Sequence, residues 1–222
     1  MFGKNKISKP QNHQGDFLNI QEIFHTFQGE GPFCLNPAIF IRLGGCNLAC
    51  KFCDTEFDNY QKLSLKQITQ EVKKISKKYP NTKLIILTGG EPLIQPINQL
   101  CQILLEQNFT IQIETNGTIY RKLPKEIKII CSPKVTNNKY HNIREDLLPD
   151  ITAFKFLISK TLKNYQSIPN IGQFKYNSAI YVQPIDEYDE LKNKNNLEYA
   201  KSLCLKNGYN LSLQLHKIIG VK

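Results

Sequence analysis

The chain has 222 residues, of which 41% are hydrophobic and 22% charged, so we expect one globular domain over 1–222, with 1–16 as a flexible or peripheral segment. No apolar run approaches the roughly 20 residues that a membrane helix needs, and no signal-peptide pattern follows the basic start, so we expect a cytoplasmic protein without membrane contact. The formal net charge is +10, but its lysines are dispersed without an aromatic recognition motif, which argues against direct nucleic-acid binding.

Strand and helix patterns alternate along the chain. Residues 19–27 and 38–45 combine apolar and β-branched side chains between Gly and Pro turn signals, which predicts strands. Ser64 precedes Gln67 by three residues, a capping-box pattern that predicts a helix over 64–79. The later predicted elements are strands at 83–90, from 109, at 127–132, 153–158, 179–184 and 211–215, and helices at 97–105 and near 196–206.

This alternation implies a parallel sheet with right-handed crossovers, closed or partly closed into a barrel. In sheets of this kind, ligand sites lie at the carboxyl ends of the strands. The cysteines at 46–53 and the segments 88–92 and 114–117 directly follow predicted strands. We therefore expect them to meet at one end of the sheet.

Three cysteines, Cys46, Cys50 and Cys53, follow the strand at 38–45. Their spacing lets one tight loop bind three irons of a cubane [4Fe–4S] cluster and leaves the fourth iron to a non-protein ligand. A structural zinc site normally needs four protein ligands, and a redox pair leaves Cys46 unexplained, but spacing alone leaves both alternatives open. The seven cysteines are an odd number and four of them are scattered, which does not indicate a disulfide framework.

Two further motifs end predicted strands: "TGGEP" at 88–92 and "ETNG" at 114–117. With the three cysteines and the aromatic Phe52 before the last of them, this order of motifs resembles the radical S-adenosylmethionine (SAM) superfamily. The resemblance implies that the cysteines hold a [4Fe–4S] cluster whose fourth iron is chelated by SAM. It also implies an α/β fold, a full or partial TIM-like (β/α) barrel, and the short chain favours a partial, trimmed barrel of the radical SAM type.

Other segments resemble one family within that superfamily, the 7-carboxy-7-deazaguanine synthases. They are "QGEG" at 28–31, Arg42, "CDT" at 53–55, "SPK" at 132–134, "QPID" at 183–186 and the terminal "QLHKIIGVK". The resemblance implies a lyase of queuosine biosynthesis, a tRNA modification pathway. Its expected reaction is the radical ring contraction of 6-carboxy-5,6,7,8-tetrahydropterin to 7-carboxy-7-deazaguanine with loss of ammonia.

The same resemblance implies a role for each matching residue. Cys46, Cys50 and Cys53 are the expected catalytic cluster ligands, and Thr55 is the expected Mg²⁺ ligand. The residues expected to bind SAM are Phe52, Cys53, Asp54, Gly90, Glu91, Glu114, Asn116, Ser132, Pro133, Lys134, Gln183, Pro184, Ile185 and Asp186. The residues expected to contact the pterin substrate are Phe27, Gln28, Gly29, Arg42, Thr88 and Lys222.

The resemblance further implies an external one-electron reductant of the flavodoxin or ferredoxin type and a homodimer. Two other function classes remain open. An activase of glycyl-radical enzymes shares the cysteine loop but has no use for QGEG and CDT. A non-enzymatic zinc-binding or RNA-binding module explains the cysteines and the basic charge, but not GGEP and ETNG at successive strand ends. The sequence assigns no role to the 137–150 segment or to His216.

Overall fold

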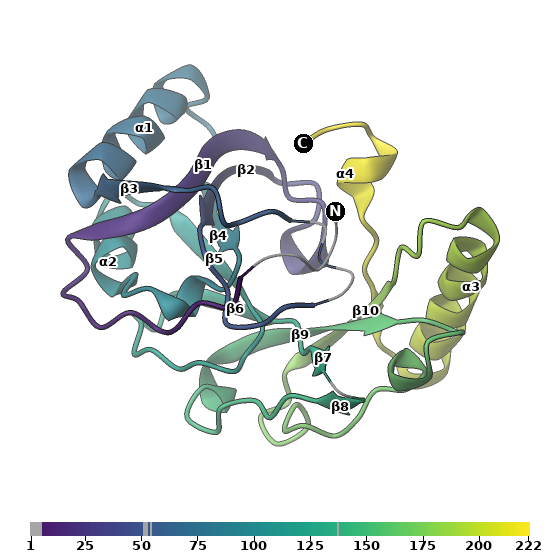
Figure 1. Ribbon diagram of the computed structural model, residues 1–222. Helices are drawn as coiled ribbons and strands as arrows, with labels where there is room; N and C mark the ends of the chain where they lie inside the picture. Colours follow the sequence, from purple (N-terminus) through teal and green to yellow (C-terminus); the bar gives the residue numbers. More distant parts are fainter. Residues whose placement is uncertain (1–5, 51–52, 54, 137) are drawn as a thin grey trace.

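A nine-stranded sheet in the order β11-β10-β9-β6-β5-β4-β2-β1-β3 forms the centre of the computed structural model, which describes residues 6–50, 53, 55–136 and 138–222 (Figure 1). Its strands are β1 (Phe17–Phe27), β2 (Pro37–Leu43), β3 (Gln61–Ser64), β4 (Leu84–Gly89), β5 (Thr110–Thr115), β6 (Lys128–Cys131), β9 (Ile151–Ile158), β10 (Ala179–Pro184) and β11 (Asn210–Leu211). A separate antiparallel pair consists of β7 (Val135–Thr136) and β8 (Lys139–Tyr140).

The helices are α1 (Leu65–Lys78), α2 (Asn98–Glu106), α3 (Glu190–Asn207) and α4 (Leu215–Ile218), with short 3-10 helices at Gly31–Phe33, Pro92–Ile94, Leu148–Asp150 and Lys163–Tyr165. Helices α1 and α2 lie outside one half of the curved sheet, and α3 lies outside the other half (Figure 1). The C-terminal α4 lies apart from these helices, across the open side of the sheet.

The sheet is a partial barrel. Strands β2, β4, β5, β6, β9, β10 and β11 pair in parallel, whereas β1 is antiparallel to both β2 and β3. Among the described residues, no pairing joins the two edge strands β3 and β11, so the sheet does not close. The trimmed α/β barrel expected from the family resemblance and the short chain is therefore confirmed.

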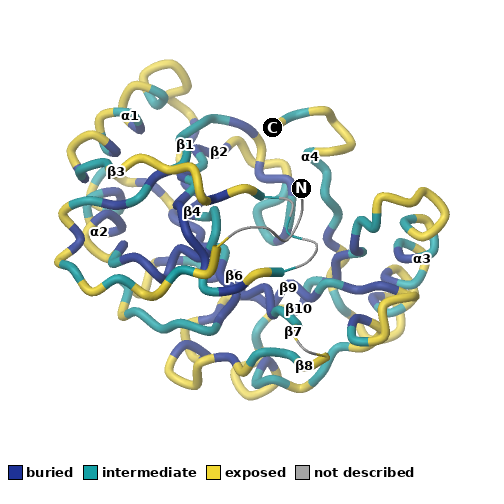
Figure 2. The backbone as a smooth tube through the Cα atoms, viewed as in Figure 1, coloured by how far each residue is buried: buried dark blue, intermediate teal, exposed yellow. Residues whose placement is uncertain are grey.

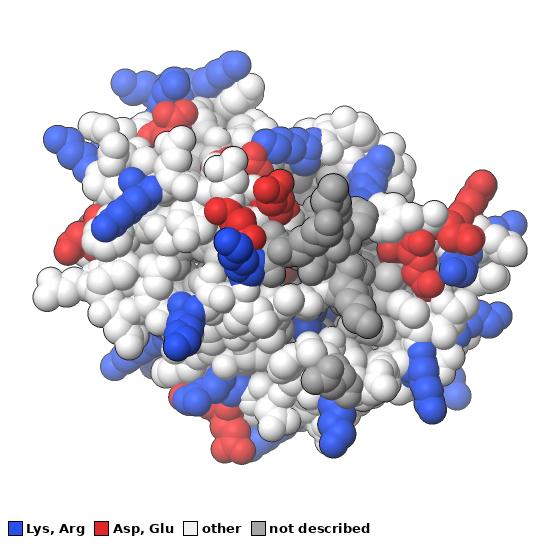
Figure 3. Space-filling view, viewed as in Figure 1, with Lys and Arg blue, Asp and Glu red and all other residues white. Residues whose placement is uncertain are grey.

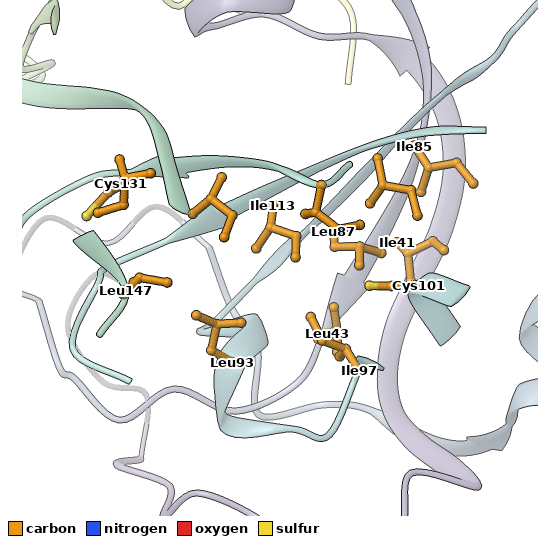
Figure 4. Packing of buried hydrophobic residues seen from close by; sticks show 14 of the residues in the cluster. Ile41, Leu43, Ile85, Leu87, Leu93, Ile97, Cys101, Ile113, Cys131 and Leu147 are labelled. Atoms are coloured by element: carbon orange, nitrogen blue, oxygen red, sulfur yellow. The ribbon is translucent and has the colours of Figure 1, made fainter. Parts of the chain in front are cut away.

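Strand β4 contributes apolar side chains to the cores on both faces of the central sheet. Its residues are buried on both faces, as expected for a strand between parallel neighbours. Ile85 and Leu87 join the large core between sheet and helices, whereas Leu84 and Ile86 join a smaller cluster on the opposite face. Figure 4 shows the first of these clusters, and Figure 2 shows the buried strands within the more exposed outer helices. Alternation with a period of two thus supplies apolar surface to both layers.

Helix α1 begins as the sequence predicts. Ser64 Oγ accepts a hydrogen bond from Gln67 N, and the Gln67 side chain accepts one from Ser64 N, which completes the capping box. The buried side chains of the helix, Leu65, Ile68 and Val72, form one stripe against the sheet. The opposite face of the helix carries exposed lysines.

The prediction of a strand at 211–215 is wrong. Strand β11 ends at Leu211, and the chain then turns toward the loop after β1, where Leu215 N donates to Gly29 O at 3.0 Å. Helix α4 starts at that contact. Apolar alternation in "LSLQL" therefore reflects contacts with two different parts of the protein rather than one sheet.

The N-terminal segment contacts the region of the cysteine loop. Ile7 forms a parallel bridge with Cys46, and Ser8 N donates to Cys46 O at 2.7 Å. Gln11 N donates to Ile94 O, and Arg121 donates to Gln11 O. The N-terminal segment 7–11 therefore packs on the protein surface next to Cys46. In the described part of the chain, none of the helices is long and apolar enough to span a membrane.

We predict that Ser64→Ala lowers the free energy of unfolding by about 1 kcal/mol, because one amide at the start of α1 loses its acceptor. Urea denaturation measures the change. Gln70→Ala, at an exposed position of the same helix, is the control and should change stability by less than about 0.5 kcal/mol. Equal effects of the two substitutions would contradict a stabilising capping box.

Candidate active site

A cavity of ≈ 540 Å³ opens at the carboxyl ends of the parallel strands. Residues from every predicted motif line it, although the motifs are far apart in sequence. The predicted site residues in its lining are Phe27, Gln28, Gly29, Arg42, Cys46, Cys50, Cys53, Thr55, Thr88, Gly90, Glu114, Asn116, Ser132, Lys134, Gln183, Pro184, Ile185, Asp186 and Lys222. The volume suits a small-molecule ligand.

Four predicted residues are not in this lining. Phe52 and Asp54 lie outside the described residues, and Pro133 follows Ser132 away from the cavity wall. Glu91, expected to accept a hydrogen bond from SAM, is 1% exposed and turned into the protein.

The three thiols lie on one short loop at the cavity wall. Cys46 packs against Leu48 and Phe57, and Cys50 and Cys53 pack against the same cluster. Cys53 N donates to Cys50 O at 3.2 Å, which holds the last two cysteines close together. Within the described ranges, no three His, Cys, Asp or Glu side chains are already grouped closely enough to hold a metal ion. The thiols instead line a common space.

The donor set fits an iron–sulfur cluster. Burial raises the pKa of Cys46 to about 12 and also raises the pKa of Cys50, so these groups are thiols in the absence of metal. Soft thiolate ligands are those that iron–sulfur clusters require, and metal binding releases their protons. Three such groups from one loop, facing a cavity, match a cluster with three protein ligands.

Two glycine turns hold the cysteine loop against the end of β4. Gly90 N donates to Leu43 O at 3.1 Å, and Glu91 N donates to Gly45 O at 2.9 Å. A Cβ atom on Gly90 would lie 1.9 Å from Gly45 O. The GGEP glycines are therefore required for contact between the two turns, and this contact fixes where the cysteine loop starts.

Glu91 connects the GGEP and ETNG motifs. Its carboxylate accepts hydrogen bonds from Leu93 N at 3.0 Å, Thr115 Oγ1 at 2.7 Å and Asn116 N at 2.7 Å. Burial raises the pKa of Glu91, although these hydrogen bonds oppose the shift. The side chain thus ties the end of β4 to the end of β5.

Asn116 continues this connection to the cysteine loop. Its Nδ2 donates to Asn47 Oδ1 at 2.9 Å, and Asn47 Nδ2 donates to Thr118 Oγ1 at 2.7 Å. Asn47 follows Cys46 directly. The ETNG motif therefore positions the loop that carries the thiols, in addition to lining the cavity.

A buried ion-pair network lies on another wall of the cavity. Lys155 Nζ is 2.6 Å from Glu30 Oε2 and 3.0 Å from Glu114 Oε2. Burial by itself raises the pKa of Glu30, but the charge and hydrogen bond of Lys155 reverse this effect and lower the pKa to about 2. The Glu30 carboxylate is consequently ionised at neutral pH.

Arg42 and the C-terminal Lys222 meet at the cavity mouth. Arg42 Nε is 2.8 Å from Glu22 Oε1, and Lys222 forms an ion pair with the other oxygen of Glu22. The Lys222 Nζ atom also lies 4.4 Å from the centre of the Phe24 ring. Burial raises the pKa of Glu22, but hydrogen bonds from Lys222 and Arg42 lower it overall. The Glu22 carboxylate thus binds both Arg42 and Lys222 beside the cavity.

The C-terminal segment crosses the cavity from β11 toward β1. Gln214 Nε2 donates to Glu30 Oε1 at 3.1 Å, and Lys217 Nζ lies 2.7 Å from Asp186 Oδ2. The His216 ring packs against Gly29, where an added Cβ atom would lie 2.2 Å from His216 Nδ1. Elsewhere on the protein, Lys and Arg are spread among Asp and Glu, as the face in Figure 3 shows.

Several lining residues were not predicted. They are Phe24, Glu30, Phe40, Leu48, Phe57, Gly89, Thr115, Lys155, Leu157, Tyr188, Gln214, His216 and Lys217. The clearest missed signal is Lys155, a charged residue in the middle of the apolar strand "ITAFKFLI". A charge at a buried strand position requires a partner, but the sequence does not say which one.

The fold and the three-thiol loop define a radical SAM enzyme. The Radical SAM superfamily matches residues 40–137, and the chain belongs to this superfamily, which implies a [4Fe–4S] cluster and SAM. The chain is 51% identical over its whole length to the 7-carboxy-7-deazaguanine synthase of Rickettsia prowazekii (strain Madrid E), covering 96% of that protein. It therefore belongs to the 7-carboxy-7-deazaguanine synthase family.

One further comparison agrees with this family, and another supports the fold. The chain is 34% identical to the 7-carboxy-7-deazaguanine synthase of Rhodospirillum rubrum, and the alignment covers 100% of both chains. The crystal structure of QueE from Escherichia coli superposes with a TM-score of 0.73 at 23% sequence identity, covering 89% of this chain and 93% of that chain. The structural similarity supports the partial-barrel fold.

We predict that Gly90→Ala lowers the free energy of unfolding by about 3 kcal/mol, because the added methyl group overlaps the Gly45 carbonyl oxygen. Gly208→Ala is the control, since an added Cβ there has open space and only its left-handed backbone costs about 1 kcal/mol. Denaturation and iron content after reconstitution measure the two effects. Equal losses in both variants would contradict the importance of the glycine contact.

We predict that Glu30 stabilises the protein above the pKa of an unfolded glutamate, about 4.3, and that this contribution is lost as the pH falls toward its folded value of about 2. Glu30→Gln lacks this dependence. The stability difference between wild type and variant should therefore shrink between pH 6 and pH 3, as measured by urea denaturation. A difference independent of pH would show that Glu30 is not stabilised in its ionised form.

Proposed function

We propose that this chain converts 6-carboxy-5,6,7,8-tetrahydropterin to 7-carboxy-7-deazaguanine. The observation that carries this proposal is one cavity in which the cysteine loop meets residues of the QGEG, SPK and QPID motifs. Full-length identity of 51% to a 7-carboxy-7-deazaguanine synthase supports the same reaction. Substrate and product differ by one ammonia, so the conversion needs no net oxidant, and SAM would act as a regenerated cofactor.

The cysteine loop is the proposed site of the cluster. Cys46, Cys50 and Cys53 would hold three irons, and SAM would occupy the fourth. When bound, these groups supply the radical chemistry that begins the reaction. Because the loop is held by Gly90 and Asn116, the reactive end of SAM would face the same cavity in every turnover.

The residues after β6 and the 183–186 segment are proposed to bind the rest of SAM. Lys134 Nζ donates to Ser132 Oγ at 2.7 Å, and both residues line the cavity. The ammonium of Lys134 suits an anionic carboxylate. The 183–186 segment supplies further lining, and its Asp186 is ionised by pairing with Lys217 despite the opposing effect of burial on its pKa.

The remaining lining is proposed to bind the pterin. Phe27, Gln28 and Gly29 offer an aromatic surface, an amide and backbone groups, which suit a flat ring with donors and acceptors at its edge. Thr88 would add a hydroxyl. Arg42 lies at the cavity mouth, where its guanidinium suits the substrate carboxylate once its contact with Glu22 is shared or exchanged. Lys222 lies beside the same Glu22.

Magnesium is proposed to bind near Thr55, which lines the cavity two residues after Cys53. Mg²⁺ prefers oxygen ligands in an octahedral arrangement and retains water. The protein would therefore need to supply only the Thr55 hydroxyl, the substrate would supply its carboxylate, and water would supply the remaining ligands. We also propose an external one-electron reductant and a homodimer.

The test is anaerobic reconstitution with iron and sulfide, followed by incubation with reductant, SAM, Mg²⁺ and 6-carboxytetrahydropterin. We predict formation of 7-carboxy-7-deazaguanine, detected by mass, and at least about a thousandfold loss in Cys50→Ala, since an intact cluster is needed. Cys204→Ala is the matched control, because Cys204 is a buried thiol of α3 outside the cavity. It should retain activity.

Other outcomes identify the competing function classes. Cleavage of SAM without the deazapurine would reject the pterin as substrate while retaining radical SAM chemistry. Radical transfer to a large protein would favour a glycyl-radical activase. A colourless protein that contains zinc but no labile sulfide would favour the non-enzymatic module.

A further inference from the structure

Lys155 is the charged residue at the centre of β9 that no sequence motif explains. It is 6% exposed, and its strand neighbours Phe154 and Phe156 are fully buried. Burying a lone ammonium is costly, so its environment must compensate the charge. The compensation comes from two carboxylates on different elements.

The contacts of Lys155 connect distant parts of the cavity wall. Glu30, in the loop after β1, accepts from Lys155 through Oε2 and from Gln214 through Oε1. Glu114, on β5, accepts from Lys155 through Oε2 and from Gln112 through Oε1 at 2.6 Å. One ammonium thus links β9, β5, the loop after β1 and the C-terminal segment.

Gln28 belongs to the same network. Its Nε2 lies 3.4 Å from Glu114 Oε1, and its Oε1 accepts from Glu30 N at 3.3 Å. The orientation of this proposed substrate-binding amide therefore depends on the Glu114 carboxylate and on the backbone amide of Glu30. Displacing the Glu114 carboxylate or the loop that carries Glu30 would move a group that lines the cavity.

The charges in the network are unequal. Two carboxylates share one ammonium, which leaves a net negative charge beside the cavity. Attraction to both carboxylates raises the pKa of Lys155 in spite of burial, which lowers it. Without the ammonium, two nearby carboxylates would face each other in a poorly solvated site, and one of them would bind a proton near neutral pH.

We propose that Lys155 is a positioning residue for the reaction proposed above: it holds Glu30 and Glu114 in place, so that the Glu114 carboxylate and the backbone of Glu30 orient Gln28, and both carboxylates present acceptors to the bound substrate. This inference rests on the proposed function for its kinetic consequence. Its electrostatic consequence can be measured without turnover.

The kinetic test compares Lys155→Gln with Lys155→Arg and with Lys201→Gln, the control in which an exposed lysine of α3 loses its pair with Glu198. We expect Lys155→Gln to raise KM for the pterin at least about tenfold at pH 7, a loss of about 1.4 kcal/mol of binding. Lys155→Arg should restore most of this loss. The loss in Lys155→Gln should be larger at pH 6 than at pH 8.5, because a carboxylate is protonated at the lower pH.

Other titratable groups near the network must be separated from this effect. His216 and Cys34 interact with Glu30, and Cys131 interacts with Glu114. Of these, His216 is the side chain whose own contribution must be removed by substitution. The pH dependence of Lys155→Gln should therefore persist when His216 is also replaced by Asn.

The closing experiment follows the glutamate carboxyl carbons by ¹³C NMR in reconstituted protein, with Glu30→Gln and Glu114→Gln to assign the two signals. In wild type, the Glu30 carboxylate should stay ionised to below about pH 5, whereas in Lys155→Gln one of the two carboxylates should titrate above about pH 6. Two carboxylates that titrate normally in Lys155→Gln would overturn the proposal. So would an unchanged KM with a flat pH profile.

A second variant tests the proposal if Lys155→Gln does not fold. Lys155→Gln combined with Glu30→Gln removes the uncompensated pair of charges, and Glu114, which is partly buried, should then titrate above its ordinary range because it has lost its cation. A normal titration of Glu114 would contradict the inference. Absence of product in the wild type would instead reject the proposed function, since the NMR result does not depend on turnover.

Discussion

The contact between two glycine turns is the constraint on which the site depends. Gly45, before the first cysteine, and Gly90, after β4, approach so closely that no side chain fits between them. Hydrogen bonds from Gly90 and Glu91 to the backbone of the cysteine turn fix this approach. Since parallel strands place both turns at the same end of the sheet, the thiols face the cavity from its wall rather than from a separate domain.

Polar contacts extend this constraint around the cavity. Glu91 ties the end of β4 to the end of β5, and Asn116 ties β5 back to the cysteine loop through Asn47. On another wall, Lys155 performs a similar function for Glu30 and Glu114. These buried groups all have partners, so the wall is organised before any ligand binds. Such preorganisation suits an enzyme in which the cofactor supplies the reactive chemistry and the protein supplies position.

Most strands and the major helices were predictable because local patterns and tertiary packing agree. Strand β4 is apolar on both faces, as a central parallel strand must be, and Ser64 caps α1 through the expected box. The segment after β11 was not predictable, because its apolar residues pack against the loop after β1 instead of extending the sheet. The short β3 was also missed, since its four residues lack a clear pattern and pair with β1 only through tertiary contact.

The sequence by itself determined the chemistry: three thiols at a cluster spacing, motifs at successive strand ends and a parallel sheet that brings them together. Tertiary structure alone decided how those groups are used. Glu91 faces inward because the backbone amides of Leu93 and Asn116 converge on it, and Arg42 shares Glu22 with the C-terminal lysine. Lys155 joins carboxylates that lie 125 and 41 residues away along the chain. Spacing along a chain identifies donors and acceptors, but partners so distant in sequence are selected by folding.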